Sequence, residues 1–302
     1  MKRYIINICK ILLALGLVVW LLKQDKIDFS LLDSYLTPEL GFVTIVFWIL
    51  TPVLLAGLRW HLILRYVLKM NISLSDSIRI HCTSLFFNGF LPGAVGGDAV
   101  KVMFGKKVLP DSQVKQWVTS CIIDRLMGLI TLIPFSLGLV GSLATAQVEG
   151  TTFQALWTAI VANVGIVGLL IGLWLYLGGK YPVKAFLIPM AVSAAVHLLT
   201  MIYFHQVAII GAMSSISLTG VLSIYPLGGL MIALPLTPGG MGVGHIVFEQ
   251  LFAIVGAQGG ANAYNIFSIG QIALNGLGML ALFVKTKASG QDINASQLKP
   301  AL

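Results

Sequence analysis

Apolar residues fill most of the chain in runs long enough to cross a lipid bilayer, separated by short polar stretches. A membrane-spanning helix needs about 20 mainly apolar residues, and six runs approach or exceed that length. The first run is the least apolar, because Asn7 and Lys10 interrupt it. The six predicted spans are residues 5–22, 41–58, 117–143, 155–178, 185–211 and 262–284.

Two further apolar segments are interrupted halfway by proline and glycine. The first interruption contains Leu91-Pro92 and Gly96-Gly97, and the second contains Leu234-Pro235 and Gly239-Gly240 at the same spacing. Proline ends a helix, and glycine permits turns that other residues disfavour. The shared spacing predicts an internal repeat whose two copies are broken helices.

Positive charge favours one arrangement of the broken segments. If residues 78–107 dip into the bilayer and return, the lysine and arginine residues on both sides of them share the cytoplasmic face, in line with the positive-inside rule. Three spans separate this segment from residues 216–255, and an odd number of crossings reverses the direction. Residues 216–255 are therefore expected to form a hairpin that opens to the opposite face. We therefore predict an all-α integral membrane protein with six full spans, two re-entrant helical hairpins in an inverted repeat, and both termini cytoplasmic.

The polar stretches are too short to form a separate soluble domain. We predict a single polytopic membrane domain, 1–302, with repeat halves at about 1–143 and 144–287 and a polar tail at 288–302. Inverted pairs of broken helices that meet at mid-bilayer are typical of secondary transporters.

Composition agrees with a membrane protein and narrows its partners. The chain is 57% hydrophobic and 10% charged, whereas soluble domains carry about 25% charged residues. Its net charge is +8, but the basic residues are spread over many loops, which argues against nucleic acid as a partner. The three cysteines lie in or beside apolar segments, so we expect buried thiols, with no disulfide and no metal site.

The two interruptions are the first candidate binding sites. Backbone without regular hydrogen bonds cannot face lipid, so these turns must line protein or a watery cavity. The helices that leave the turns begin at the glycine pairs and point N–H groups at the bilayer midplane, where such helix starts favour anions. This predicts an anionic lipid headgroup bound between the two breaks. Close helix packing at the glycines is the alternative.

Four charged residues accompany the first break. Asp98 lies in the first turn of the leaving helix, where it could cap the helix or serve the site. Lys101 shares its face and could pair with Asp98, or bind a phosphate if Asp98 pairs instead with Arg125. Asp124 and Arg125 lie inside a predicted span, where charge is usually functional, with structural stabilisation as the alternative. We expect one of these two side chains to face the site and the other to brace a hairpin.

The second break adds His245 and Glu249, which are four residues apart on the leaving helix and could point into the cavity as a route for protons. Asn88 ends the first entering helix and could act as a cap or line the site. The complete set of candidate substrate-binding residues is Asn88, Pro92, Gly96, Gly97, Asp98, Lys101, Asp124, Arg125, Pro235, Pro238, Gly239, Gly240, Gly242, His245 and Glu249.

Polar residues elsewhere in the apolar runs have plainer interpretations. His197 and His205 share a helix face, and we expect them to hydrogen-bond between helices and not to bind metal. A group of basic residues after the second span is expected to anchor the cytoplasmic face and attract anionic headgroups. That group is Arg59, His61, Arg65 and Lys69.

The motifs, taken in order, resemble a known family. Leu91-Pro92-Gly93 with Gly96-Gly97-Asp98, then Asp124-Arg125, then Pro238-Gly239-Gly240 are similar to the transmembrane, flippase-like domain of lysylphosphatidylglycerol synthases, over nearly the whole chain. The resemblance implies a multi-span plasma-membrane protein of bacteria or archaea that moves or handles phospholipids or polyprenyl-linked lipids. It also implies a free-standing relative, because nothing here resembles the synthase's aminoacyl transferase domain.

Two departures from the family pattern concern the binding site. The family usually has arginine where this chain has Lys101, and glutamate soon after the second glycine motif, where this chain has Gly244-His245. Lysine is a point charge without the two-pronged guanidinium of arginine, so the headgroup preference could differ.

Together these features predict a lipid flippase or lipid-binding transporter for an anionic phospholipid or polyprenyl-linked lipid. The alternatives are a membrane transferase that acts on a lipid-linked substrate and a non-catalytic membrane scaffold. We expect membrane lipids as partners, along with a lipid-biosynthesis enzyme or a second copy of the chain. We expect no cofactor and no catalytic activity.

Overall fold

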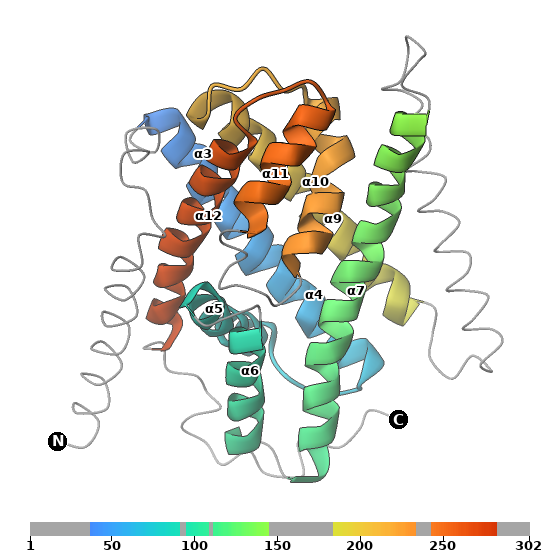
Figure 1. The fold of residues 1–302 in the computed structure, drawn as a ribbon. Helices are drawn as coiled ribbons and strands as arrows, with labels where there is room; N and C mark the ends of the chain where they lie inside the picture. Colours follow the sequence, from blue (N-terminus) through green and yellow to red (C-terminus); the bar gives the residue numbers. More distant parts are fainter. Residues whose placement is uncertain (1–36, 91–94, 109–110, 145–183, 234–242, 283–302) are drawn as a thin grey trace.

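The computed structural model describes residues 37–90, 95–108, 111–144, 184–233 and 243–282 (Figure 1). Every regular element within these ranges is a helix, as the apolar runs predict. The predicted spans at 5–22 and 155–178 lie outside the described residues.

Three helices of the described part are long and apolar enough to cross a membrane. They correspond to three of the predicted spans: the first extends beyond its predicted run at both ends, the second begins earlier and ends earlier, and the third has the predicted bounds. They comprise Pro38–Val67, Gln113–Ile133 and Ala185–Gly211.

The first of these helices changes its winding along its length. It consists of α3 (Pro38–Trp48), η2 (Ile49–Leu55), α4 (Ala56–Leu62) and η3 (Ile63–Val67), of which η2 and η3 are π-helical. Pro52 lies within η2, and a wider turn accommodates the hydrogen bond that proline cannot donate. The continuous helix carries the basic residues of α4 inside the protein, beyond the predicted end of the span.

Both predicted helix interruptions are present as helix ends. In the first segment, α5 (Leu74–Phe90) is followed by α6 (Val95–Val108), and in the second, α10 (Leu218–Ala233) is followed by α11 (Val243–Ile254). The two helices of each pair pack against each other. The turns between them lie outside the described residues.

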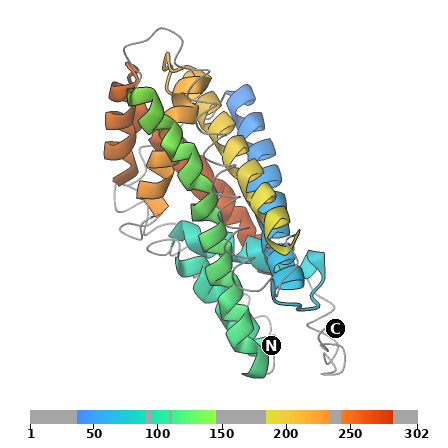
Figure 2. The ribbon, with the colours of Figure 1, turned by 90° about the vertical axis from the view of Figure 1, so that its right-hand side faces the viewer.

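The two broken segments pack along different parts of α7 (Asp111–Ala144). Gly105 of α6 lies against the ring of Trp117, near the start of α7, whereas Gly229 of α10 contacts Leu132, further along the helix. Figure 1 shows α6 beside the lower part of α7 and α10 in the upper half of the molecule, and Figure 2 shows the same order from the side.

An aromatic core fixes the second broken segment to its neighbours. It lies between α10, α11, α9 (Lys184–Gln206) and α12 (Gly260–Leu277), which is followed by η6 (Gly278–Leu282). Phe204 packs against Tyr225 and Phe248, and the ring of Phe248 stacks on Tyr264. The α10–α11 pair is therefore held by large buried rings, whereas the α5–α6 pair meets polar and charged neighbours.

Candidate functional site

Two cations from different helices meet one carboxylate on α7. Arg59 Nε of α4 lies 2.7 Å from Asp124 Oδ1, and Lys101 Nζ of α6 lies 3.6 Å from Asp124 Oδ2. Asp124 is 6% exposed and Lys101 only 2%. Charges so far from water are costly unless they are paired and hydrogen-bonded, so this cluster fixes the relative positions of α4, α6 and α7.

Arg59 also ties α9 into the cluster. Its Nη1 donates a hydrogen bond to Ser193 Oγ over 2.8 Å. Gly128, one turn after Asp124, lies beside the guanidinium, and a Cβ at that position would make an ordinary contact 3.5 Å from Arg59 Nη1. The same glycine's carbonyl oxygen is 2.9 Å from His197 Nε2, which confirms the predicted hydrogen bond between helices.

The prediction that Arg59 and His61 anchor the cytoplasmic face is wrong. The Arg59 side chain is 11% exposed and engages Asp124, and His61 is buried with its Nδ1 3.1 Å from Ser77 Oγ. Both residues lie on a helix that continues to Val67, so they lie well before its end and face neighbouring helices. Arg65 and Lys69, nearer the end, are exposed as expected.

Two tryptophan side chains contact Lys101, one at its amine and one at its backbone. Its Nζ lies 4.6 Å from the centre of a Trp60 ring, within the range of a cation–π contact. Trp60 Nε1 donates to Ser120 Oγ, and Trp117 Nε1 donates to the carbonyl oxygen of Lys101. Both rings are thus held in place by hydrogen bonds, and the amine has one aromatic neighbour and one carboxylate neighbour.

Asp98 forms an ion pair with Arg125, as one of the predictions states. Both side chains are partly exposed. Asp98 and Lys101, three residues apart on α6, therefore pair with the adjacent α7 residues Arg125 and Asp124, and not with each other. Of the two charged residues on α7, Asp124 faces the buried cluster and Arg125 faces the start of α6.

The start of α6 packs tightly against the end of α5. The Gly97 N–H donates to Asn88 Oδ1 over 2.7 Å, so Asn88 caps this helix. A Cβ on Gly97 would lie 2.4 Å from the carbonyl oxygen of Ser84. Gly97 therefore serves close packing of the two helices. Its N–H group, one of those expected to bind an anion, already donates to Asn88. Gly96 is buried beside it.

His245 and Glu249 do not join this cluster. Glu249 is exposed, and its Oε2 accepts a hydrogen bond from the N–H of Ala261 at the start of α12. The His245 ring packs edge-on against Tyr264. A Cβ on Gly244 would lie 2.1 Å from the same tyrosine ring, so any larger residue there would require Tyr264 to move.

The remaining candidates are not placed by the structure, and no metal site is found in the part of the chain that it describes. Among the described residues, no group of three or more histidine, cysteine, aspartate or glutamate side chains could hold a metal ion. The candidates that lie outside the described residues are Pro92, Pro235, Pro238, Gly239, Gly240 and Gly242.

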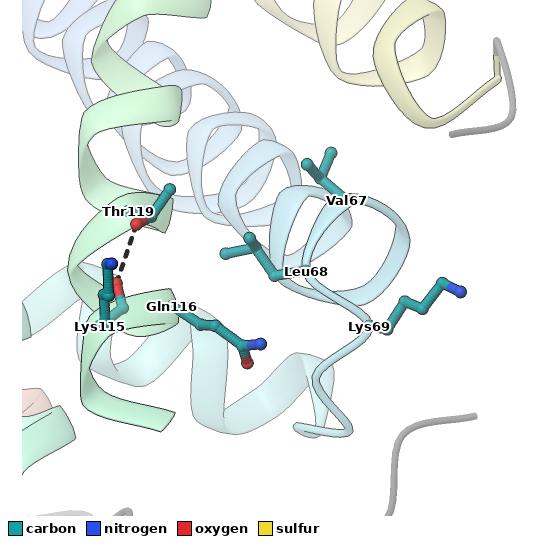
Figure 3. A pocket seen from close by; sticks show the side chains of 6 residues that line it. All are labelled: Val67, Leu68, Lys69, Lys115, Gln116 and Thr119. Atoms are coloured by element: carbon teal, nitrogen blue, oxygen red, sulfur yellow. Dashed lines mark hydrogen bonds between the residues drawn. The ribbon is translucent and has the colours of Figure 1, made fainter. Parts of the chain in front are cut away.

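A separate hollow of about 400 Å³ lies between η3 and the start of α7 (Figure 3). Leu68 and Gln116 point into it, whereas the Lys69 side chain points away. None of the predicted site residues lines this hollow. Its lining residues are Val67, Leu68, Lys69, Lys115, Gln116 and Thr119.

The fold and the cluster define a multi-pass membrane protein with buried charge among its spanning helices. Residues 7–269 match the family described as the lysylphosphatidylglycerol synthase TM region. The chain belongs to that family.

One curated relative supports the assignment as a membrane protein. A UPF0104 membrane protein of Pyrococcus horikoshii is 27% identical over 137 residues, which are 45% of this chain and 39% of the relative. The alignment thus spans well under half of the relative's length. No solved structure matches the chain.

Proposed function

We propose that this protein is a lipid flippase that binds the headgroup of an anionic phospholipid or polyprenyl-linked lipid and carries it between leaflets. The observation that carries this proposal is the buried cluster of Arg59, Lys101 and Asp124. Two cations share one carboxylate there, and Asp98 and Arg125 balance each other. Counted over the described residues of the cluster, one positive charge is left over.

A surplus positive charge inside a membrane favours an anionic ligand. Charge at that depth is expensive, and ionisable residues within spanning helices commonly mark substrate pathways. A lipid phosphate would neutralise the surplus while its acyl chains stay in the bilayer. Membership of a family named for a lipid synthase agrees with a lipid substrate.

The proposed architecture is six spans and two re-entrant hairpins in an inverted repeat within a single domain. Support comes from the breaks in both segments and from their packing along different parts of α7. In such a protein, rocking of one half against the other would expose the headgroup site to each leaflet in turn. The proposal places both termini in the cytoplasm and the protein in a prokaryotic plasma membrane.

The test is lipid movement in proteoliposomes. Purified protein is reconstituted with trace fluorescent phosphatidylglycerol, and dithionite quenching reports how much label moves between leaflets. The proposal expects faster movement than in empty vesicles, and reduced movement with Asp98→Ala. Movement equal to that in empty vesicles, across anionic phospholipids and polyprenyl phosphates, would overturn it. Consumption of an activated sugar or aminoacyl donor would instead support a transferase.

A further inference from the structure

We propose that Lys101 and His81, one from each helix of the first broken pair, together bind the phosphate of the headgroup. This inference rests on the proposed function for the choice of a lipid, but binding can be measured without transport. His81 lies on α5 and Lys101 on α6. Arg59, Asp124 and Ser193 would serve as the fixed frame on the longer helices.

The buried side chain of His81 has no hydrogen-bond partner among the described residues. It is 5% exposed, and neither ring nitrogen makes a hydrogen bond among the residues that the structure describes. The carbonyl oxygen of Pro52 approaches the ring, but not with the geometry of a hydrogen bond. Buried polar groups nearly always have a partner, and leaving one without costs stability. An imidazole in this state is suited to a ligand.

The charged neighbours of His81 are those of the cluster. Lys101, Asp124 and Arg59 all act on it electrostatically. Of the other groups on helices packed against α5, His61 of α4 already makes a hydrogen bond with Ser77. The described parts of η2, α12 and η6 carry no charged side chain. His81 therefore faces the same surplus positive charge as Asp124, and a neutral imidazole can place its N–H on either nitrogen.

Lys101 is the cation that a ligand could take over. Its contact with Asp124 is 3.6 Å, longer than a hydrogen bond, whereas Arg59 donates directly to the same carboxylate at 2.7 Å. Asp124 would therefore keep a close partner if the amine moved to a phosphate oxygen. The Trp60 ring, 4.6 Å from the amine, offers the amine a second contact that does not compete for its protons.

The charge count sets the class of ligand. A phosphodiester carries one negative charge, which cancels the single surplus positive charge of the cluster. A zwitterionic headgroup would bring a cation of its own next to Lys101 and Arg59, where like charges repel. The subsite is thus assigned to a phosphate whose headgroup carries no positive charge. A lipid and a water-soluble phosphate share this chemistry, and the experiment separates them.

The experiment measures binding to the full chain in phosphate-free detergent. Dioctanoyl phosphatidylglycerol is titrated and bound lipid is measured by native mass spectrometry, with dioctanoyl phosphatidylcholine and glycerol 3-phosphate as the comparison ligands. His81→Phe replaces the imidazole with a ring that has no nitrogen atoms. Lys101→Met removes the amine and keeps an unbranched side chain of similar length. We expect each to weaken phosphatidylglycerol binding about tenfold or more, as the loss of a hydrogen bond to a charged group implies.

Two matched controls lie outside the cluster. Lys115→Met removes an exposed lysine of α7, and His205→Leu removes a half-buried histidine of α9. Both should leave the affinity for phosphatidylglycerol within about twofold. If His81→Phe does not fold, His81→Leu removes the same ring nitrogens and should weaken binding in its place, whereas His81→Gln retains an N–H donor and should restore binding toward the wild-type level.

The binding measurements test the phosphate subsite separately from the flippase proposal. Unchanged binding in folded His81→Phe and Lys101→Met protein would overturn the subsite, as would equal affinity for phosphatidylcholine. Glycerol 3-phosphate binding as tightly as the lipid would show that the ligand is a soluble phosphate. If the variants lose binding as expected but wild-type vesicles show no lipid movement, the subsite stands and the flippase proposal fails.

Discussion

The guanidinium of Arg59 donates a hydrogen bond to Asp124 across 2.7 Å, although 65 residues separate the two in the sequence. The contact joins the helix Pro38–Val67 to α7, and a second hydrogen bond of Arg59, to Ser193, joins it to α9. Three long apolar helices are therefore fastened together by buried polar groups. Lys101 adds α6 to this frame through a looser contact.

Because Arg59 contacts Asp124 more closely than Lys101 does, substitutions of Asp124 and Lys101 are predicted to change stability by different amounts. Asp124→Asn leaves two buried cations without a counter-charge, and we expect a loss of about 3–5 kcal/mol in the free energy of unfolding, the usual cost of breaking a buried pair. Lys101→Met leaves Arg59 and Asp124 balanced and should cost much less. Thermal unfolding of both variants in detergent checks this, and equal losses would show that Lys101 is a structural member of the cluster.

The ion pair between Asp98 and Arg125 is predicted to matter for transport and not for insertion. Both side chains are partly exposed, so removing either should change stability by no more than about 1 kcal/mol. Asp98→Ala and Arg125→Ala should nevertheless bring lipid movement down to the level of empty vesicles. Both variants are compared with the wild type at equal amounts of reconstituted protein. Wild-type transport rates in both would assign the pair to structure alone.

Gly97→Ala should loosen the contact between α5 and α6. The added Cβ would lie 2.4 Å from the carbonyl oxygen of Ser84, a backbone atom that cannot move without its helix, and such overpacking costs about 1–3 kcal/mol. Gly276→Ala in α12 is the matched control, because nothing lies within 4 Å of its Cβ. The melting temperatures of the two variants in the same detergent check this, and equal values would contradict the packing role.

Glu249→Gln tests whether this carboxylate takes part in transport. Its contact with the N–H of Ala261 at the start of α12 identifies it as a helix cap, and a glutamine oxygen can accept the same hydrogen bond. We expect unchanged lipid movement and a stability change of under about 1 kcal/mol. A lower rate of lipid movement in this variant would instead support a proton route through His245 and Glu249.

Several features could be predicted from the sequence because local chemistry determines them. Proline and glycine predict a break between α5 and α6 and another between α10 and α11, and the structure describes each pair as separate helices. Asp98 could be matched with Arg125 because both lie next to recognisable motifs in apolar surroundings. The hydrogen bond from His197 across helices followed from the absence of other ligands on its helix.

The cluster itself could not be predicted, because it depends on how distant helices pack. Arg59 follows an apolar run by one residue, a position typical of an interfacial anchor, and only the extension of that helix to Val67 places it inside. His81 carries no local signal that it lacks a partner. The contact of Glu249 could not be predicted either, because the sequence does not show that the start of α12 lies beside it.

Selection of the substrate by charge can be tested by comparing two headgroups in one set of proteoliposomes. Fluorescent phosphatidylglycerol and phosphatidylcholine with identical chains are followed by dithionite quenching in wild-type and protein-free vesicles. If a surplus positive charge beside Asp124 selects the substrate, the protein accelerates movement of the anionic lipid and has little effect on the zwitterionic one. Equal acceleration of both lipids would contradict a headgroup site based on that charge.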